Sequence, residues 1–164
     1  MVSDGAALLA VDRDRRIVAA NAEGRRHLFK RALFAWLIAD GDMHLKNLAL
    51  LKSAEAGVRQ FSTVRFAPLY DAVTTRVFPN LAGDRMALKL NGKDDRLTRR
   101  DFISLARTID LPVSRAEALM SETTARLGEA APNLALPRFS RQKTARTAAN
   151  SIRSILKERI EPLL

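Results

Sequence analysis

Four polar residues have the types and spacing that phosphoryl-transfer chemistry uses. Asp42, His44 and Asn47 lie within six residues, and Asp71 follows Asn47 by 24 residues. Transfer of a phosphoryl group from ATP needs a carboxylate that orients the attacking hydroxyl and accepts its proton. It also needs oxygen ligands for Mg²⁺, such as an Asn and a second carboxylate. The pattern therefore makes Asp42 a candidate base, and Asn47 with Asp71 a candidate Mg²⁺ pair.

Each of these residues also has a purely structural interpretation. An Asp beside a glycine, as Asp42 is beside Gly41, commonly forms a turn. A single histidine is more often structural than catalytic, and an Asp at the end of a strand often caps the next element. The spacing alone leaves these interpretations open.

The surrounding segments predict how the polar residues are positioned. Residues 27–39 are apolar nearly all round after their first turn, which indicates a buried helix. The short apolar run at 48–51 predicts a strand, and residues 61–71 form a second extended segment interrupted by Pro68. We therefore expect the loop 40–47 to connect a buried helix to a short hairpin, with Asp71 at the far end of the second extended segment.

The flanking regions carry their own signals. Two apolar runs in residues 6–20 predict a hairpin, and Asn21 is placed to cap the helix that follows. Asn91-Gly92 is a strong turn signal. Two pairs have capping-box spacing, Thr98 with Asp101 and Ser114 with Glu117. The later expected elements are an alternating segment at 86–90, helices at 100–110 and 115–128 separated by Leu111-Pro112, a linker marked by Pro132 and Pro137, and a last helix over 145–160 with its apolar stripe inward and most of its basic residues outward.

Length and composition exclude several classes of protein. The chain has 164 residues, of which 47% are hydrophobic, and it has no Cys and a formal charge of +10. This length suits one domain with a core. The absence of Cys excludes a disulfide scaffold, a thiolate metal site and a Cys nucleophile. No stretch approaches the ~18 apolar residues of a membrane span. We therefore expect a cytoplasmic protein without membrane contact.

The positive charge is concentrated late in the chain. Seven basic residues and one acid lie between residues 138 and 159, and such a stripe can bind phosphate backbones. A solvated helix face is the alternative, and no aromatic residues interleave the stripe to stack on bases. The candidate nucleic-acid contacts are Arg138, Arg141, Lys143, Arg146 and Arg153.

Three ordered segments resemble the HipA family, the serine/threonine kinases of bacterial toxin–antitoxin modules. Residues 34–51 are similar to the family's catalytic stretch "F-N-x-L-I-G-N-G-D-x-H-x-K-N-x-x-L-L". Residues 66–75 resemble "L-x-P-x-Y-D-x-x-S/T-T", and residues 86–93 resemble "M-A-L-K-I-N-G-K". The resemblance implies a mainly α, α+β fold: a protein-kinase-like large C-terminal lobe with a short catalytic β-hairpin.

The resemblance also implies a role for each matching residue. Asp42 would be the catalytic base, and Asn47 and Asp71 would hold Mg²⁺. The residues expected to line ATP are His44, Leu45, Lys46, Asn47, Tyr70 and Asp71. A solvated loop cation is the alternative for Lys46. The implied cofactors are ATP and Mg²⁺, and the implied substrate is a protein Ser or Thr.

The sequence departs from the family pattern in two places and lacks one part. Ala35 and Asp40 replace asparagines, which removes amide hydrogen bonds and adds a negative charge two residues from Asp42. Upstream of residue 28 there is no Gly-rich loop, and no Lys precedes Lys30. We therefore expect residues 1–27 to be a hairpin-like segment with a weak PAS likeness and not a kinase small lobe. Residues 28–130 would form the HipA-like lobe, and residues 131–164 its linker and basic C-terminal helix.

These observations leave several functions open. A truncated or split HipA-type kinase would show little activity alone and would need a separately encoded small lobe. A small-molecule kinase fragment of the aminoglycoside or choline type shares a similar loop, but Asp40 stands where its His would be. A metallophosphoesterase would need more histidines than His27 and His44. A non-catalytic module that contacts a helix-turn-helix antitoxin and its operator DNA is the remaining alternative.

Overall fold

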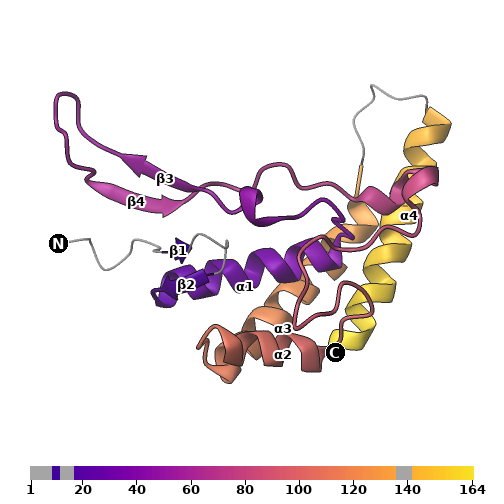
Figure 1. Cartoon of the computed structure of the whole chain (residues 1–164). Helices are drawn as coiled ribbons and strands as arrows, with labels where there is room; N and C mark the ends of the chain where they lie inside the picture. The colour runs from indigo at the N-terminus through magenta and orange to yellow at the C-terminus, as the bar shows by residue number, and fades with distance from the viewer. Residues whose placement is uncertain (1–8, 12–16, 136–141) are drawn as a thin grey trace.

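The computed structural model describes residues 9–11, 17–135 and 142–164, and this part of the chain is mainly helical (Figure 1). Its helices are α1 (Ala22–Leu37), α2 (Arg99–Thr108), α3 (Val113–Ala130) and α4 (Gln142–Ile160). Its strands are β1 (Leu9–Val11), β2 (Ile17–Ala20), β3 (Leu50–Ser53) and β4 (Thr63–Phe66). The expected α+β class, mainly α, is confirmed.

The hydrophobic core forms around α1, which contacts α2, α3 and α4. Phe29 and Leu33 of α1 are fully buried, as the nearly continuous apolar sequence of this helix predicts. Phe29 meets Phe102 of α2 edge to face, with ring centroids 6.0 Å apart. The other large, fully buried side chains are Leu37, Leu97, Leu119, Met120 and Leu163. The helical body thus holds the C-terminal end of α1 in a fixed place.

The β3–β4 hairpin projects away from this body (Figure 1). Its two strands are antiparallel, with Leu50 opposite Phe66 and Ser53 opposite Thr63. The strand predicted at 48–51 begins two residues later, and the extended segment 61–71 is a strand only over Thr63–Phe66. The tip, residues 54–62, is exposed. The hairpin therefore separates the loop 40–47 from Asp71 in sequence while its paired base keeps the two close in space.

Several local predictions are confirmed. The Asn21 side chain caps α1 by accepting a 2.8 Å hydrogen bond from the Gly24 amide. Thr98 and Asp101 form the predicted capping box at the start of α2. β1 and β2 pair as an antiparallel hairpin. Asn91 and Gly92, both with positive φ, make the predicted turn between Leu90 and Lys93. Short-range signals fixed these features because each depends on few neighbours.

One local prediction, the capping box at Ser114, is wrong. α3 begins at Val113 with Pro112 as its cap, so Ser114 and Glu117 both lie inside the helix and form no capping box. The Glu117 carboxylate instead accepts a 2.8 Å hydrogen bond from Arg99. The alternating segment 86–90 contains no regular strand, only the single bridge at its end.

The last helix was expected over 145–160 with much of its basic set outward, and it begins at Gln142. Ala149 and Leu156 face inward as expected. Arg159, one of its basic residues, is 5% exposed and packs on Trp36. Pro132 lies in a short 3₁₀ turn, Ala131–Asn133, and Pro137 falls outside the described residues. In the part of the chain that the structure describes, no helix is long and apolar enough to cross a membrane.

Candidate phosphoryl-transfer site

The loop that follows α1 presents the candidate base. α1 ends at Leu37 with Ile38 as its C-cap, and Ala39 turns the chain with a φ of 55°. Asp40 is then buried at 3% exposure, whereas Asp42 is exposed. The Asp40 carboxylate accepts a 3.2 Å hydrogen bond from the Asp42 amide and another from the Val73 amide. The loop is thereby tied to the segment that carries Asp71, and Asp42 points into solvent from a fixed backbone.

Burial of Asp40 has an electrostatic consequence. Loss of water raises the Asp40 pKa above its ordinary value, and the two backbone amides only partly oppose this effect. Asp42 and Asp71 both lie close enough to raise this pKa further. Asp40, which stands where the family pattern has an asparagine, therefore accepts hydrogen bonds from two backbone amides. When ionised, its carboxylate also adds negative charge near Asp42 and Asp71.

Asn47 and Asp71 are in direct contact. The Asn47 amide nitrogen donates a 3.1 Å hydrogen bond to Asp71 Oδ2. The Asn47 Oδ1 atom accepts a 2.9 Å hydrogen bond from the His44 amide, and the residue is 7% exposed. Asp71 is exposed and has a φ of 55°, a strained conformation for a residue other than glycine. The structure thus brings together two residues that are 24 positions apart and orients the Asp71 carboxylate from a tight turn.

The remaining predicted ATP-lining residues surround this pair. His44 precedes a 3₁₀ turn formed by Leu45, Lys46 and Asn47. The Lys46 carbonyl accepts a 2.5 Å hydrogen bond from the Tyr70 hydroxyl, which links the turn to the Asp71 segment a second time. Lys46 itself is exposed. The buried His44 Nδ1 atom has no hydrogen-bond partner among the residues that the structure describes. All six predicted residues therefore lie on two loops that are joined to each other.

One cation at this site was missed by sequence reasoning. Arg31 of α1 lines a small depression whose other walls include Asp40, Asn47 and Asp71. Its Nη2 atom donates to the Ala67 carbonyl at 2.5 Å, while its buried Nη1 atom has no partner in the described part of the chain. Burial lowers the pKa of this guanidinium. In the sequence, Arg31 follows Lys30 directly, and nothing in its local pattern distinguishes it from a solvated cation.

The residues at this site suit a Mg²⁺ ion that is also bound by water and nucleotide. They do not form a metal site made of protein ligands alone. The described residues contain no group of three or more His, Cys, Asp or Glu side chains that could hold a metal ion. Mg²⁺ is commonly bound by one or two protein oxygens together with water and substrate phosphates. Asp71 leaves its Oδ1 atom available, and the Asn47 carbonyl oxygen has a second lone pair. This donor set suits an ion that arrives with a nucleotide.

The structure describes the side chains of two of the five candidate nucleic-acid residues, Arg146 and Arg153. Arg138 and Arg141 lie outside the described residues, and Lys143 lies in α4 with a side chain that the structure does not describe. Arg146 is exposed. The Arg153 guanidinium is engaged within the fold, since it donates to the carbonyls of Ala131, Pro132 and Leu134 at 3.0, 3.2 and 3.1 Å. Among these candidates, only Arg146 is placed with an exposed side chain.

Comparison with known proteins identifies the class to which this helical body, hairpin and loop belong. The model of the HipA-like C-terminal domain matches residues 6–131, and the chain belongs to this family. The resemblance inferred from the three sequence segments is thereby confirmed. No curated protein matches at a significant level.

The fold is also similar to a particular solved structure, that of HipA in the Shewanella oneidensis MR-1 toxin–antitoxin system of HipA, HipB and its operator DNA. The TM-score is 0.66 at 19% sequence identity, over 85% of this chain and 31% of that one. The chain therefore spans about a third of the length of the HipA it matches, and the likeness at this identity concerns the fold.

Proposed function

We propose that this chain is the catalytic large lobe of a HipA-type, ATP-dependent protein serine/threonine kinase of a toxin–antitoxin system. The observation that carries the proposal is the hydrogen bond between Asn47 and Asp71, beside a loop that exposes Asp42. A base and two oxygen ligands for the metal are among the parts that phosphoryl transfer requires of a protein. Membership of the HipA-like C-terminal domain family supports the same assignment.

The proposed roles follow from exposure and hydrogen bonding. Asp42 accepts the proton of the attacking Ser or Thr hydroxyl, since its carboxylate is exposed and its backbone is held by Asp40. Asn47 and Asp71 would hold Mg²⁺, which when bound neutralises charge on the ATP phosphates. Arg31, through its unpartnered Nη1, is placed to donate to an anionic group in the depression that these residues line.

The proposal includes a second source of ATP contacts. The sequence contains no Gly-rich phosphate loop before the matched segments, and the chain covers 31% of the matched HipA. We therefore expect little turnover by this chain alone and propose that a small lobe completes the ATP cradle. Turnover restored by adding a HipA small lobe, and abolished again by Asp42→Ala, is the expected result. In this assay, phosphate should be transferred to protein Ser or Thr and not to aminoglycosides. The small-molecule kinase hypothesis predicts the opposite result.

Metal binding tests the site without requiring turnover. Mn²⁺ can replace Mg²⁺ at an oxygen site, and it broadens the NMR signals of nearby amides. With ATP present, we expect broadening at the amides of Asn47 and Asp71, and its loss in Asp71→Asn. Asp110→Asn, which removes an exposed carboxylate at the end of α2, is the matched control and should change nothing. Broadening that persists in Asp71→Asn would contradict the proposed metal site.

A second proposal concerns partners. The matched structure contains an antitoxin, HipB, and its operator DNA, and this chain carries a formal charge of +10. We propose that this chain acts with a helix-turn-helix antitoxin and that its basic surface contacts the operator DNA. DNA affinity should then fall steeply with salt, and Arg146→Ala should reduce the slope of log affinity against log salt by about one. Binding that does not change with salt would remove this role.

A further inference from the structure

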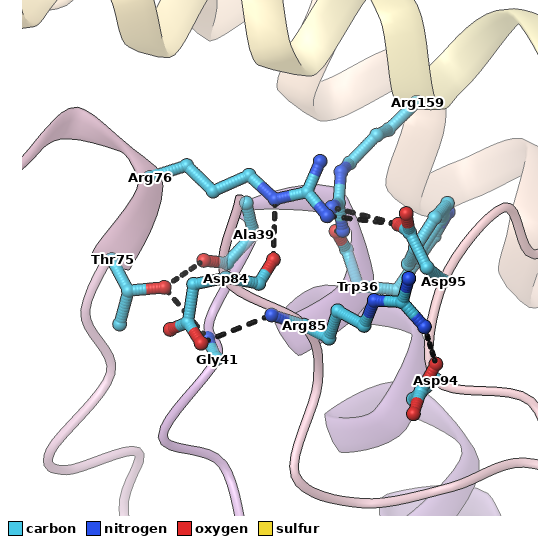
Figure 2. A network of polar contacts seen from close by, with 10 residues as sticks. All are labelled: Trp36, Ala39, Gly41, Thr75, Arg76, Asp84, Arg85, Asp94, Asp95 and Arg159. Atoms are coloured by element: carbon cyan, nitrogen blue, oxygen red, sulfur yellow. Dashed lines mark hydrogen bonds and ion pairs between the residues drawn. The ribbon is translucent and has the colours of Figure 1, made fainter. Parts of the chain in front are cut away.

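A buried arginine from the last helix contacts the end of α1. Arg159 lies with its guanidinium 3.8 Å from the centre of the Trp36 ring, and its Nη1 atom donates a 2.6 Å hydrogen bond to the Trp36 carbonyl (Figure 2). The same carbonyl accepts the Ala39 amide at 3.0 Å, at the point where the chain leaves the helix. The last turn of α1 contains no basic residue, so a cation 123 residues away supplies the positive charge that a helix C-terminus favours.

The Arg159 guanidinium also forms an ion pair with Asp95. Asp95 Oδ1 lies 3.6 Å from Arg159 Nη2 and accepts a 2.9 Å hydrogen bond from Arg76 Nη2 (Figure 2). The Arg76 Nε atom donates to the Asp84 carbonyl at 2.6 Å. One carboxylate therefore links the last helix to the segment that runs from residue 75 to residue 84.

This segment holds the loop that exposes Asp42. The Thr75 hydroxyl donates to the Ala39 carbonyl and accepts from the Gly41 amide, both at 3.1 Å. The Asp84 carboxylate packs so closely on Gly41 that a Cβ there would lie 2.6 Å from Asp84 Cγ. Two routes thus lead from Arg159 to the residues directly before Asp42, one through Trp36 and one through Asp95 and Arg76.

We propose that Arg159 is a positioning residue that fixes the loop bearing Asp42, so that α4 completes the candidate site without touching it. A role of Arg159 in catalysis rests on the proposed function of Asp42. The structural coupling between α4 and the loop does not depend on that function. The family model matches residues 6–131, so this contribution comes from beyond the matched segment.

The electrostatics argue against a role in packing alone. Burial, together with the neighbouring Arg76, lowers the Arg159 pKa to about 10, and Asp95 only partly opposes the effect. A buried charged group is commonly less stabilising than an apolar side chain of similar volume. An apolar residue could fill the same space but could not bond the Trp36 carbonyl or pair with the Asp95 carboxylate. These two interactions account for an arginine at this buried position.

Amide hydrogen exchange on the whole chain, measured without nucleotide, tests the coupling. Arg159→Lys keeps the charge but loses the two-pronged geometry. We expect exchange at the amides of Ala39 and Gly41 to rise about tenfold, with Leu119 in α3 nearly unchanged, because local opening is sensitive to local contacts. Arg153→Lys is the matched control on the same helix: its partners are the Asn150 side chain and carbonyls of residues 131–134, so the loop should keep its wild-type exchange.

The outcomes separate positioning from general stability and from the proposed activity. A uniform rise at Gly41 and Leu119, an equal effect of Arg153→Lys, or no change at Gly41 would each overturn the proposal. If Arg159→Lys does not fold, Asp95→Asn keeps the Trp36 contact and should still raise exchange at Gly41 selectively. Failure of Mn²⁺ to bind at Asp71 would refute the metal site and leave this result standing, since the measurement uses neither metal nor ATP.

Discussion

At Gly41, the addition of a single methyl group should lower the stability of the fold measurably. A Cβ on this residue would overlap the Asp84 carboxylate and would lie 2.7 Å from Thr75 Oγ1. The carboxylate can rotate away, but Thr75 is held by two hydrogen bonds of 3.1 Å. To reach the 3.4 Å of ordinary van der Waals contact, Thr75 Oγ1 must retreat by about 0.7 Å, which stretches both bonds beyond useful length.

These displacements set the magnitude. Loss of two hydrogen bonds costs about 1–3 kcal/mol, and the overlap with Asp84 adds about 1 kcal/mol. Replacing a glycine also restricts the unfolded chain, which offsets about 0.4–1 kcal/mol. We therefore expect Gly41→Ala to lower the free energy of unfolding by about 1–4 kcal/mol. In the Asp84→Ala background the cost should be smaller by about 1 kcal/mol, because only the contact with Thr75 remains.

Denaturant unfolding can measure this, with the fluorescence of Trp36, the only tryptophan in the sequence, as the signal. Gly128→Ala is the control, since Gly128 is in α3 and a Cβ there meets nothing within 4 Å. That control should raise the free energy of unfolding by about 0.5–1 kcal/mol. A Gly41→Ala protein as stable as the wild type, or a cost unaffected by Asp84→Ala, would refute the packing described here.

Two further predictions concern pH. Burial raises the Asp40 pKa, so the ionised carboxylate lowers stability at neutral pH. Asp40→Asn should therefore be more stable than the wild type at pH 7, and the difference should vanish as the pH falls through the raised pKa and below the ordinary value of 3.8. For Asp101, burial is outweighed by hydrogen bonds from Lys93 and Thr98, so its pKa is lowered. Asp101→Ala should cost about 1 kcal/mol near neutral pH, and this cost should disappear as the pH falls through the lowered pKa. Unfolding curves at several pH values check both; a constant difference in either case would contradict the assignment.

Sequence patterns predicted the parts of the fold that local forces decide. The caps at Asn21 and Thr98 follow from side chains that bond amides three residues ahead. The buried character of α1 follows from its apolar sequence, and the turn at Asn91-Gly92 from residues that tolerate positive φ. The cap predicted at Ser114 was wrong because Pro112 can end the preceding loop and start the helix earlier.

The candidate site also has features that could be predicted from the sequence and features that appear only in the structure. The types and spacing of Asp42, Asn47 and Asp71 indicated a base and a pair of metal ligands, and the resemblance to HipA implied the same roles. Spacing did not show that Asn47 and Asp71 touch, since this depends on how the paired hairpin base returns the chain. Arg31 was missed because one arginine in a helix carries no signal until its surroundings are known.

The family and the mainly helical class could be predicted from the sequence, which also named Asp42 as the candidate base. Only the tertiary structure decided that Arg153 and Arg159, two of the late basic residues, face carbonyls and a carboxylate within the fold. Charge and helical period predict a solvated face, but they carry no information about which distant elements offer acceptors. The end of α1 and Asp95 supply the acceptors for Arg159, and residues 131–134 supply those for Arg153. An unpaired donor in such partly or fully buried places would be costly.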